Sequence, residues 1–246
     1  NPKKDVLFSF EGLIHLQPSE FKLLVADFQK RGFDRVAAIY YARPHCGYAA
    51  SAISQRVKMG KLPMEGLNVP ALDHVRILTG LRTVFEGDDL IVRPFIPKQF
   101  PKKDLVYDFL MEALNIPVKN ELEKAVPVER QNESLSLFGI QLGSKIIEKL
   151  SLLEVQIPPA EFNKTLGTLL SAFPGPKYEL SVLSQEILFK QTRHITAWMK
   201  EQFQFDLDDF RQEENEESNS KGKLESSHLL LADALANYAV DCLKSS

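Results

Sequence analysis

The apolar run at residues 36–41 is the feature that most restricts what this chain can fold into. It reads VAAIYY and carries no charged side chain. Continuous apolar runs of this length, rich in β-branched and aromatic residues, are typical of strands that are buried on both faces. Strands of that kind belong to parallel sheets that helices cover on both sides. The run therefore predicts an α/β fold, with a parallel sheet as the middle one of three layers.

Two more strands and several helices are predicted around this run. Residues 6–10 (VLFSF) are a second candidate strand, and residues 89–95 are a third, ended by Pro94. A helical pattern lies between the first two strands, from Pro18 to Gly32. Strand, helix and strand at this spacing predict a right-handed βαβ unit. Further helices are predicted over residues 48–58, 71–85, 105–114, 135–150, 160–173, 184–203 and 229–243.

The patterns change along the chain and predict four segments. An α/β core covers residues 1–125, and a helical C-terminal half of the same domain covers residues 126–211. An acidic linker is predicted at residues 212–225, because its residues 213–223 contain no apolar side chain and are mostly charged or polar. A terminal helix covers residues 226–246. The predicted order is thus an α/β half followed by a helical region.

The composition indicates the class of protein and excludes some partners. The 246 residues are 44% hydrophobic and 26% charged, which is typical of a soluble globular protein. A formal net charge of −3 provides no overall positive field, so we expect no nucleic-acid partner, and any anion site must be local. No apolar run approaches the ~18 residues that a membrane span requires, so no span is expected.

Cysteine and histidine usage gives no sign of disulfides or metal. Cys46 and Cys242 are too few for a disulfide framework, and we expect reduced thiols and a cytoplasmic protein. The histidines are scattered and show no metal-ligand spacing, so no metal site is expected. They stand at positions 15, 45, 74, 194 and 228.

Arg43 and Ser51 are the candidate ligand-binding pair. Arg43 follows the strand at residues 36–41, and ligands of open α/β sheets bind beyond the carboxyl ends of the strands. Ser51 lies in the first turns of the predicted helix that follows. An arginine can donate two hydrogen bonds to a phosphate, a nearby hydroxyl can donate a third, and a helix start adds its positive dipole. The pair therefore predicts an anion pocket.

This segment resembles the 3′-phosphate-binding motif of sulfotransferases that use 3′-phosphoadenosine 5′-phosphosulfate. In that motif an Arg-Pro pair ends a strand and a serine follows eight residues after the arginine, as Arg43, Pro44 and Ser51 do here. The likeness is greatest to bacterial carbohydrate-type sulfotransferase-like proteins of polysaccharide gene clusters. Further stretches that resemble them are QRVKMG at residues 55–60, LIVRPF at 90–95, DLVYDFL at 104–110 and NESLS at 132–136.

The resemblance extends over about residues 5–210. It implies a P-loop-like sheet and an enzyme that moves a sulfuryl group from 3′-phosphoadenosine 5′-phosphosulfate to a carbohydrate hydroxyl. Arg43 and Ser51 would bind the 3′-phosphate of the cofactor. Glu11, at the end of the predicted first strand, matches the position of the general base that accepts the proton of the acceptor hydroxyl. Each of these residues also fits an ordinary structural role, Glu11 as a helix cap or a solvated side chain.

Three basic residues are candidates for binding the carbohydrate. Lys58 and Arg56 lie on the helix that contains Ser51, where they also fit a solvated helix face. Arg93, at the end of the strand at residues 89–95, points toward the ligand edge, but we expect it to pair with Asp88 or Asp89.

One part of the family pattern has no counterpart in the sequence. The family begins with a strand, a loop rich in glycine, threonine and serine, and a helix, and the loop binds the 5′-phosphosulfate. Nothing before Val6 has this pattern, so we expect the loop in a segment upstream of this sequence. The alternatives are a non-catalytic interaction module with the sulfotransferase fold, or another transferase of polysaccharide biosynthesis, such as a glycosyltransferase.

Overall fold

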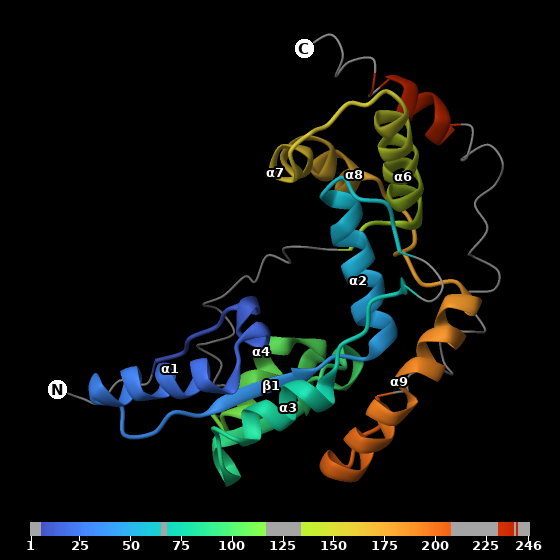
Figure 1. Ribbon diagram of the computed structural model, residues 1–246. Coiled ribbons are helices and arrows are strands. Elements are labelled where there is room, and N and C mark those ends of the chain that lie inside the picture. Colours follow the sequence, from blue (N-terminus) through green and yellow to red (C-terminus); the bar gives the residue numbers. More distant parts are fainter. Residues whose placement is uncertain (1–5, 65–67, 117–133, 208–230, 239, 241–246) are drawn as a thin grey trace.

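The computed structural model describes residues 6–64, 68–116, 134–207, 231–238 and 240, which form two lobes (Figure 1). In chain order the helices and strands are α1 (Pro18–Lys30), β1 (Ala38–Ala42), α2 (His45–Lys58), α3 (His74–Arg82), β2 (Leu90–Pro94), α4 (Leu105–Asp108), α6 (Leu137–Leu152), α7 (Pro159–Phe162), α8 (Thr168–Ala172) and α9 (Val182–Phe203). The π-helical turns Phe109–Ala113 and Asn163–Gly167 continue α4 and join α7 to α8. Short 3-10 turns lie at Glu11–His15, Gly87–Asp89, Pro97–Gln99 and Pro101–Lys103, and residues 231–238 are helical.

The sheet of the described residues consists of β1 and β2, which pair in parallel. The register runs from Ala38 opposite Leu90 to Ala42 opposite Pro94. The amide of Phe95 then donates to the carbonyl of Ala42 at 2.8 Å, which extends the ladder past Pro94. The crossover between the two strands contains α2 and α3. The predicted α/β class and parallel pairing are confirmed, in a structure that is mostly helical.

The strand predicted at residues 6–10 is wrong. These residues form no regular secondary structure, and Phe10 leads directly into the turn Glu11–His15. Val6 and Leu7 are 62% and 67% exposed, and the ring of Phe8 packs edge-on against that of Phe28 in α1. A β-favouring composition forms a strand only where another strand supplies hydrogen bonds, and none of the described residues does so here. The predicted βαβ unit around α1 is therefore not formed.

Within the described residues the predicted helices are present, and the sequence explains several of their starts. The predicted acidic linker at residues 212–225 lies outside the described residues, as do the ends of the helix predicted at 229–243. At α1, the amide of Gln17 donates to the carboxylate of Glu20 at 2.7 Å in a capping box. Ser136 caps α6 and Ser181 caps α9 through their hydroxyl oxygens. Helix α2 begins at His45, three residues before the predicted position 48, and so directly follows the turn at Arg43.

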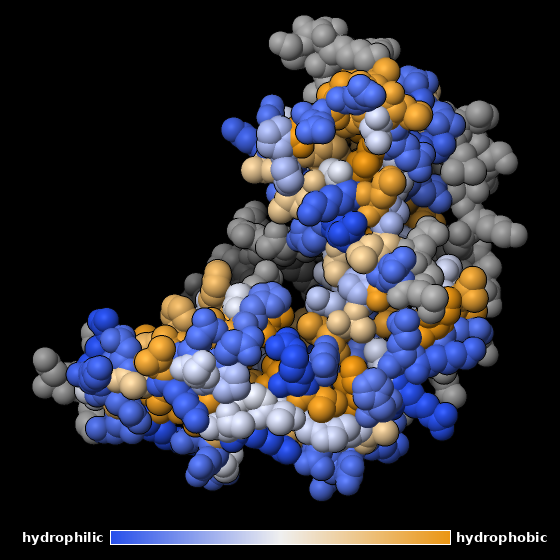
Figure 2. Space-filling view, in the orientation of Figure 1, coloured by the Kyte–Doolittle hydropathy of each residue, from blue (hydrophilic) through white to orange (hydrophobic). Residues whose placement is uncertain are grey.

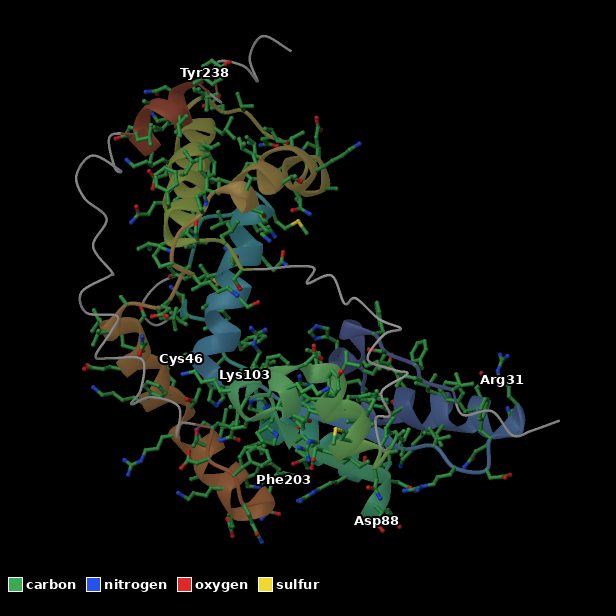
Figure 3. All side chains as sticks on the ribbon, turned by 180° about the vertical axis from the view of Figure 1, so that it is seen from behind. Arg31, Cys46, Asp88, Lys103, Phe203 and Tyr238 are labelled. Carbon is green, nitrogen blue, oxygen red and sulfur yellow. The ribbon has the colours of Figure 1, made fainter. Side chains whose placement is uncertain are left out.

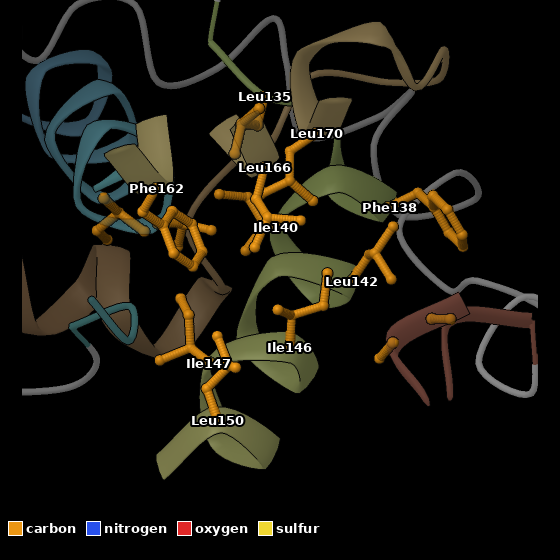
Figure 4. Packing of buried hydrophobic residues seen from close by; sticks show 14 of the residues in the cluster. Leu135, Phe138, Ile140, Leu142, Ile146, Ile147, Leu150, Phe162, Leu166 and Leu170 are labelled. Atoms are coloured by element: carbon orange, nitrogen blue, oxygen red, sulfur yellow. The ribbon is translucent and has the colours of Figure 1, made fainter. Parts of the chain in front are cut away.

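Two hydrophobic clusters fill the two lobes. In the sheet lobe, Tyr40 and Ala42 of β1 pack with Leu78 of α3 and Met199 of α9. In the helical lobe, α2 packs against α6 and the turn Asn163–Gly167, and α8 packs against α6. Figure 4 shows buried side chains of this cluster around α6. The members there that are fully buried are Ala49, Ile53, Val57, Ile146, Leu170, Leu188, Ala232 and Ala236. Because α9 supplies residues to both clusters and α2 runs from the sheet into the helical lobe, these two helices hold the lobes together.

The two lobes meet at an angle and leave one side of the molecule hollowed (Figure 2). Seen from behind, Cys46 lies at the end of α2 that meets α9 and the sheet lobe (Figure 3). The same end of α2 follows β1 after a short turn that contains Arg43. The conformation of this turn therefore sets the angle between the lobes.

Close packing of α2 on α6 requires a glycine at position 143. A Cβ atom built there would overlap the side chain of Val57 in α2 and lie 2.9 Å from Cδ1 of Leu170 in α8. Both neighbours are fully buried, so neither can move aside without disturbing the core.

We therefore expect Gly143→Ala to lower the free energy of unfolding by about 1–3 kcal/mol through overpacking. Urea unfolding followed by circular dichroism measures this change. Gly80→Ala in α3 is the matched control, because its Cβ atom would lie an ordinary 3.5 Å from Pro18. Equal stability of the two variants would contradict the assignment of Gly143 to this contact.

Candidate anion site at the carboxyl edge of the sheet

Arg43 lies at the carboxyl edge of the sheet, between β1 and α2. Ala42, the last residue of β1, is fully buried, and Pro44 turns the chain with φ −52° and ψ 140° before the helix begins. Pro44 has no side-chain group to cap the helix. The first amide groups of an α-helix have no acceptor within the helix, and they carry its positive dipole. Arg43 is thus joined to a helix start whose amide groups favour an anion.

The guanidinium of Arg43 is half-buried and packs on an aromatic ring. Its Cζ atom lies 5.5 Å from the ring centroid of Phe95, the residue that follows β2. Its Nε atom lies 3.9 Å from the place a Cβ atom would take on Gly47, so the side chain runs along the first turn of α2. Within the described residues no carboxylate bonds to it. Burial lowers the pKa of Arg43 from its ordinary value, yet an arginine remains charged at neutral pH.

Ser51 shares the face of α2 on which Arg43 lies. Gly47 and Ser51 are four residues apart in one helix, so they point to the same side, about 6 Å apart along the axis. Ser51 is partly buried, and its hydroxyl makes no hydrogen bond to any described residue. The structure therefore brings the two predicted phosphate-binding residues to one surface, with Gly47 between them.

A buried histidine holds the turn that carries Arg43. Nε2 of His74, in α3, lies 3.1 Å from the main-chain oxygen of Arg43, and Nδ1 lies 2.7 Å from the hydroxyl of Tyr40. A carbonyl can only accept, so Nε2 carries the hydrogen and Nδ1 accepts from Tyr40. Burial lowers the pKa of His74 to about 4, which keeps this neutral form at physiological pH. No local pattern in the sequence marks His74 as a residue that supports the site.

His45 lies beside His74 at the first position of α2. The two ring centroids are 5.2 Å apart, and His45 is 1% exposed. Neither ring nitrogen of His45 has a hydrogen-bond partner within the described residues. Burial, with smaller contributions from His74 and His194, lowers the pKa of His45 to about 4.

Both histidines make folding sensitive to acid. An unfolded histidine titrates near pH 6.5, and these two titrate near 4 in the folded state, so the unfolded chain binds more protons as the pH falls through this range. Each should cost on the order of 2 kcal/mol of stability between pH 7 and pH 5.

Urea unfolding at both pH values tests this expectation, with His45→Phe as the comparison. The variant should lose clearly less stability than the parent between pH 7 and pH 5, because one of the two titrating groups is gone. An unchanged pH dependence would contradict the assignment to His45.

Arg93 pairs with Asp108, and the predicted pairing with Asp88 or Asp89 is wrong. Its Nε and Nη2 atoms each donate to one carboxylate oxygen of Asp108, both at 2.8 Å. The ion pair raises the pKa of Arg93. Asp89 instead accepts from Nε of Arg35 at 2.5 Å. Asp108 lies on α4, whose packing against β2 no local pattern in the sequence predicts.

The carboxylate of Asp108 joins α4 to both strands. Besides its two bonds from Arg93 of β2, it accepts a 2.7 Å hydrogen bond from the hydroxyl of Tyr41 in β1. The side chain of Asp108 is 2% exposed and that of Arg93 is 26% exposed, so removal of the carboxylate would leave a partly buried arginine without its partner.

Asp108→Ala should therefore lower the free energy of unfolding by about 2–4 kcal/mol. Chemical denaturation at pH 7 measures this loss. Asp27→Ala is the matched control, because the exposed pair of Asp27 with Arg31 on α1 should contribute less than about 1 kcal/mol. A loss no larger than that of the control would show that the Asp108 pair does not stabilise the sheet edge.

The remaining predicted site residues lie apart from Arg43. Arg56 and Lys58 are in the last turn of α2, about 20 Å along the helix from its start. Nε of Arg56 donates to the carbonyl of Leu62 at 3.3 Å, and Lys58 is 8% exposed. Glu11 begins the turn Glu11–His15, and its side chain lies outside the described residues.

Several other features bear on function. Comparisons with protein-family models, with curated proteins and with solved structures found no match to this chain.

Over the described ranges, no helix is long and apolar enough to cross a membrane. The same part of the chain contains no group of three or more histidine, cysteine or acidic side chains that could bind a metal ion. A depression of about 700 Å³ lies in the helical lobe, between Gly60, Leu150 and Phe162, far along α2 from Arg43.

Proposed function

We propose that the surface formed by Arg43, Gly47 and Ser51 binds the 3′-phosphate of 3′-phosphoadenosine 5′-phosphosulfate, and that the chain transfers the sulfuryl group to a carbohydrate hydroxyl. The observation that carries this proposal is the half-buried guanidinium of Arg43, which bonds to no carboxylate of the described residues. Burying a charge without a counter-ion is unfavourable, and an anionic ligand would compensate it.

The chemistry of these groups suits a phosphate. The guanidinium can donate two parallel hydrogen bonds to phosphate oxygens, and the ring of Phe95 limits its movement. The hydroxyl of Ser51 can donate a further bond from one turn along α2. The amide groups at the start of α2 add positive potential. The order of these residues also matches the motif that the sequence resembles.

The proposed reaction is a direct transfer. The acceptor hydroxyl attacks the sulfur, the bond from sulfur to the bridging phosphate oxygen breaks, and adenosine 3′,5′-bisphosphate leaves. Glu11 is the proposed general base that takes the hydroxyl proton. We further propose the P-loop-like, three-layer sheet of this enzyme class and a cytoplasmic location. The two tyrosines of β1 support a layered arrangement. Tyr40 and Tyr41 are consecutive, so their side chains point to opposite faces of the sheet. Tyr40 bonds to a residue of α3 and Tyr41 to a residue of α4, so these two helices lie on opposite faces.

The proposed acceptor residues fit an extended ligand. Along α2, Arg56 and Lys58 lie about 8–10 Å beyond Ser51 and about 14–17 Å beyond Gly47, so a carbohydrate of more than one sugar unit could span the distance from the phosphate surface. Arg93 is also a proposed acceptor residue, but it would offer a sugar few donors, because its Nε and Nη2 atoms already donate to Asp108.

A second candidate is a non-catalytic interaction module. It is favoured by the exposed apolar side chains of Val6, Leu7 and Phe10, which are 62%, 67% and 67% exposed. Apolar surface of this kind marks contact sites with other proteins. Such a module would not require a nucleotide.

Isothermal titration with adenosine 3′,5′-bisphosphate tests the proposed function. The parent chain should bind, and Arg43→Ala should weaken binding by about 30-fold or more, equivalent to about 2 kcal/mol, because a charge-assisted bidentate contact is lost. Arg31→Ala is the control of equal charge, since Arg31 is exposed directly after α1 and pairs with Asp27. Absence of binding by the parent, or equal affinity of the Arg43 variant, would overturn the assignment and favour the interaction module.

A further inference from the structure

Neither the backbone nor the packing explains the glycine at position 47. Gly47 lies inside α2 and is exposed, and its φ is not positive, unlike those of Gly32, Gly60, Gly87 and Gly175. A Cβ atom there would meet one neighbour, Nε of Arg43, at an ordinary 3.9 Å. Glycine within a helix is less stable than alanine, so some other property should favour it.

The surroundings of Gly47 indicate what that property is. On one side is the guanidinium of Arg43, and one helical turn further along the same face is the hydroxyl of Ser51. Neither group bonds to a carboxylate or to another acceptor within the described residues. The missing side chain leaves the helix backbone bare between two unused donors. An anion that contacts both must lie against the backbone at position 47.

We propose that Gly47 determines specificity for the phosphomonoester at this site. This inference rests on the proposed function and adds that the 3′-phosphate lies in direct contact with the backbone of Gly47. A phosphate oxygen there fills the space that a methyl group would occupy. A nucleotide without a 3′-phosphate has no atom at this position, so its affinity does not depend on the residue at position 47. Gly47 thereby lets the site discriminate adenosine 3′,5′-bisphosphate from adenosine 5′-monophosphate.

Gly47→Ala tests the inference, with Gly80→Ala as its matched control. Both are helical glycines with room for a Cβ atom, and Gly80 faces Pro18 of α1 rather than Arg43. The Tm of each variant should equal or exceed that of the parent, because alanine favours the helix. By calorimetric titration, Gly47→Ala should bind adenosine 3′,5′-bisphosphate at least about tenfold more weakly, and Gly80→Ala should bind as the parent does. Binding of adenosine 5′-monophosphate should be the same in all three proteins.

The possible failures have different meanings. If the parent and Gly47→Ala bind the bisphosphate equally, the inference about Gly47 is wrong and the proposed function stands. If the parent does not bind it, both are wrong. If Gly47→Ala loses affinity for both nucleotides alike, or its Tm falls, the residue has a general structural role and the specificity inference is wrong.

Discussion

The burial of α2 is the constraint on which the rest of this structure depends. Ala49, Ile53 and Val57 form a fully buried stripe against the helical lobe, and burying the larger two contributes roughly 1.5–3 kcal/mol each. The other end of the same helix is attached to the sheet by a short turn, and His74 holds the carbonyl of Arg43 at 3.1 Å. The direction in which Arg43 leaves the sheet is therefore set by core packing on both sides of it.

Two arginines at the carboxyl edge of the sheet have different roles because of what they can reach. Arg93 lies opposite Tyr41 in the register, and both bond to the buried carboxylate of Asp108. Because this ion pair already uses the donors of Arg93, a ligand would gain little binding energy from it. Arg43, past the end of β1, packs on Phe95 and Gly47 and reaches no carboxylate among the described residues. An unpaired charge near a helix start has most to gain from an anion, which is why the proposed site is built around it.

The same edge contains groups that must stay neutral. His45 and His74 are buried with their rings in contact. The hydroxyl of Tyr40 donates to Nδ1 of His74, which leaves the hydrogen on Nε2 to bond the turn. Protonation would place charge on buried rings, and Asp73, near His74, would offset only a small part of that cost. The polar network that supports the candidate site is therefore stable only at pH values at which both histidines are neutral.

By itself the sequence determined the strands at residues 38–42 and 90–94, their parallel pairing, most helix spans and the position of Arg43 at a strand end. Those features follow from apolar periodicity and from the order strand, arginine, proline and helix, which are local. Only the tertiary structure decided that residues 6–10 form no strand, that Arg93 pairs with Asp108, that His74 holds the turn, and that Lys58 is buried. These outcomes depend on which surfaces meet across long separations in the chain. A one-dimensional pattern shows that a residue can form a hydrogen bond or be buried, but the partner is chosen by three-dimensional packing.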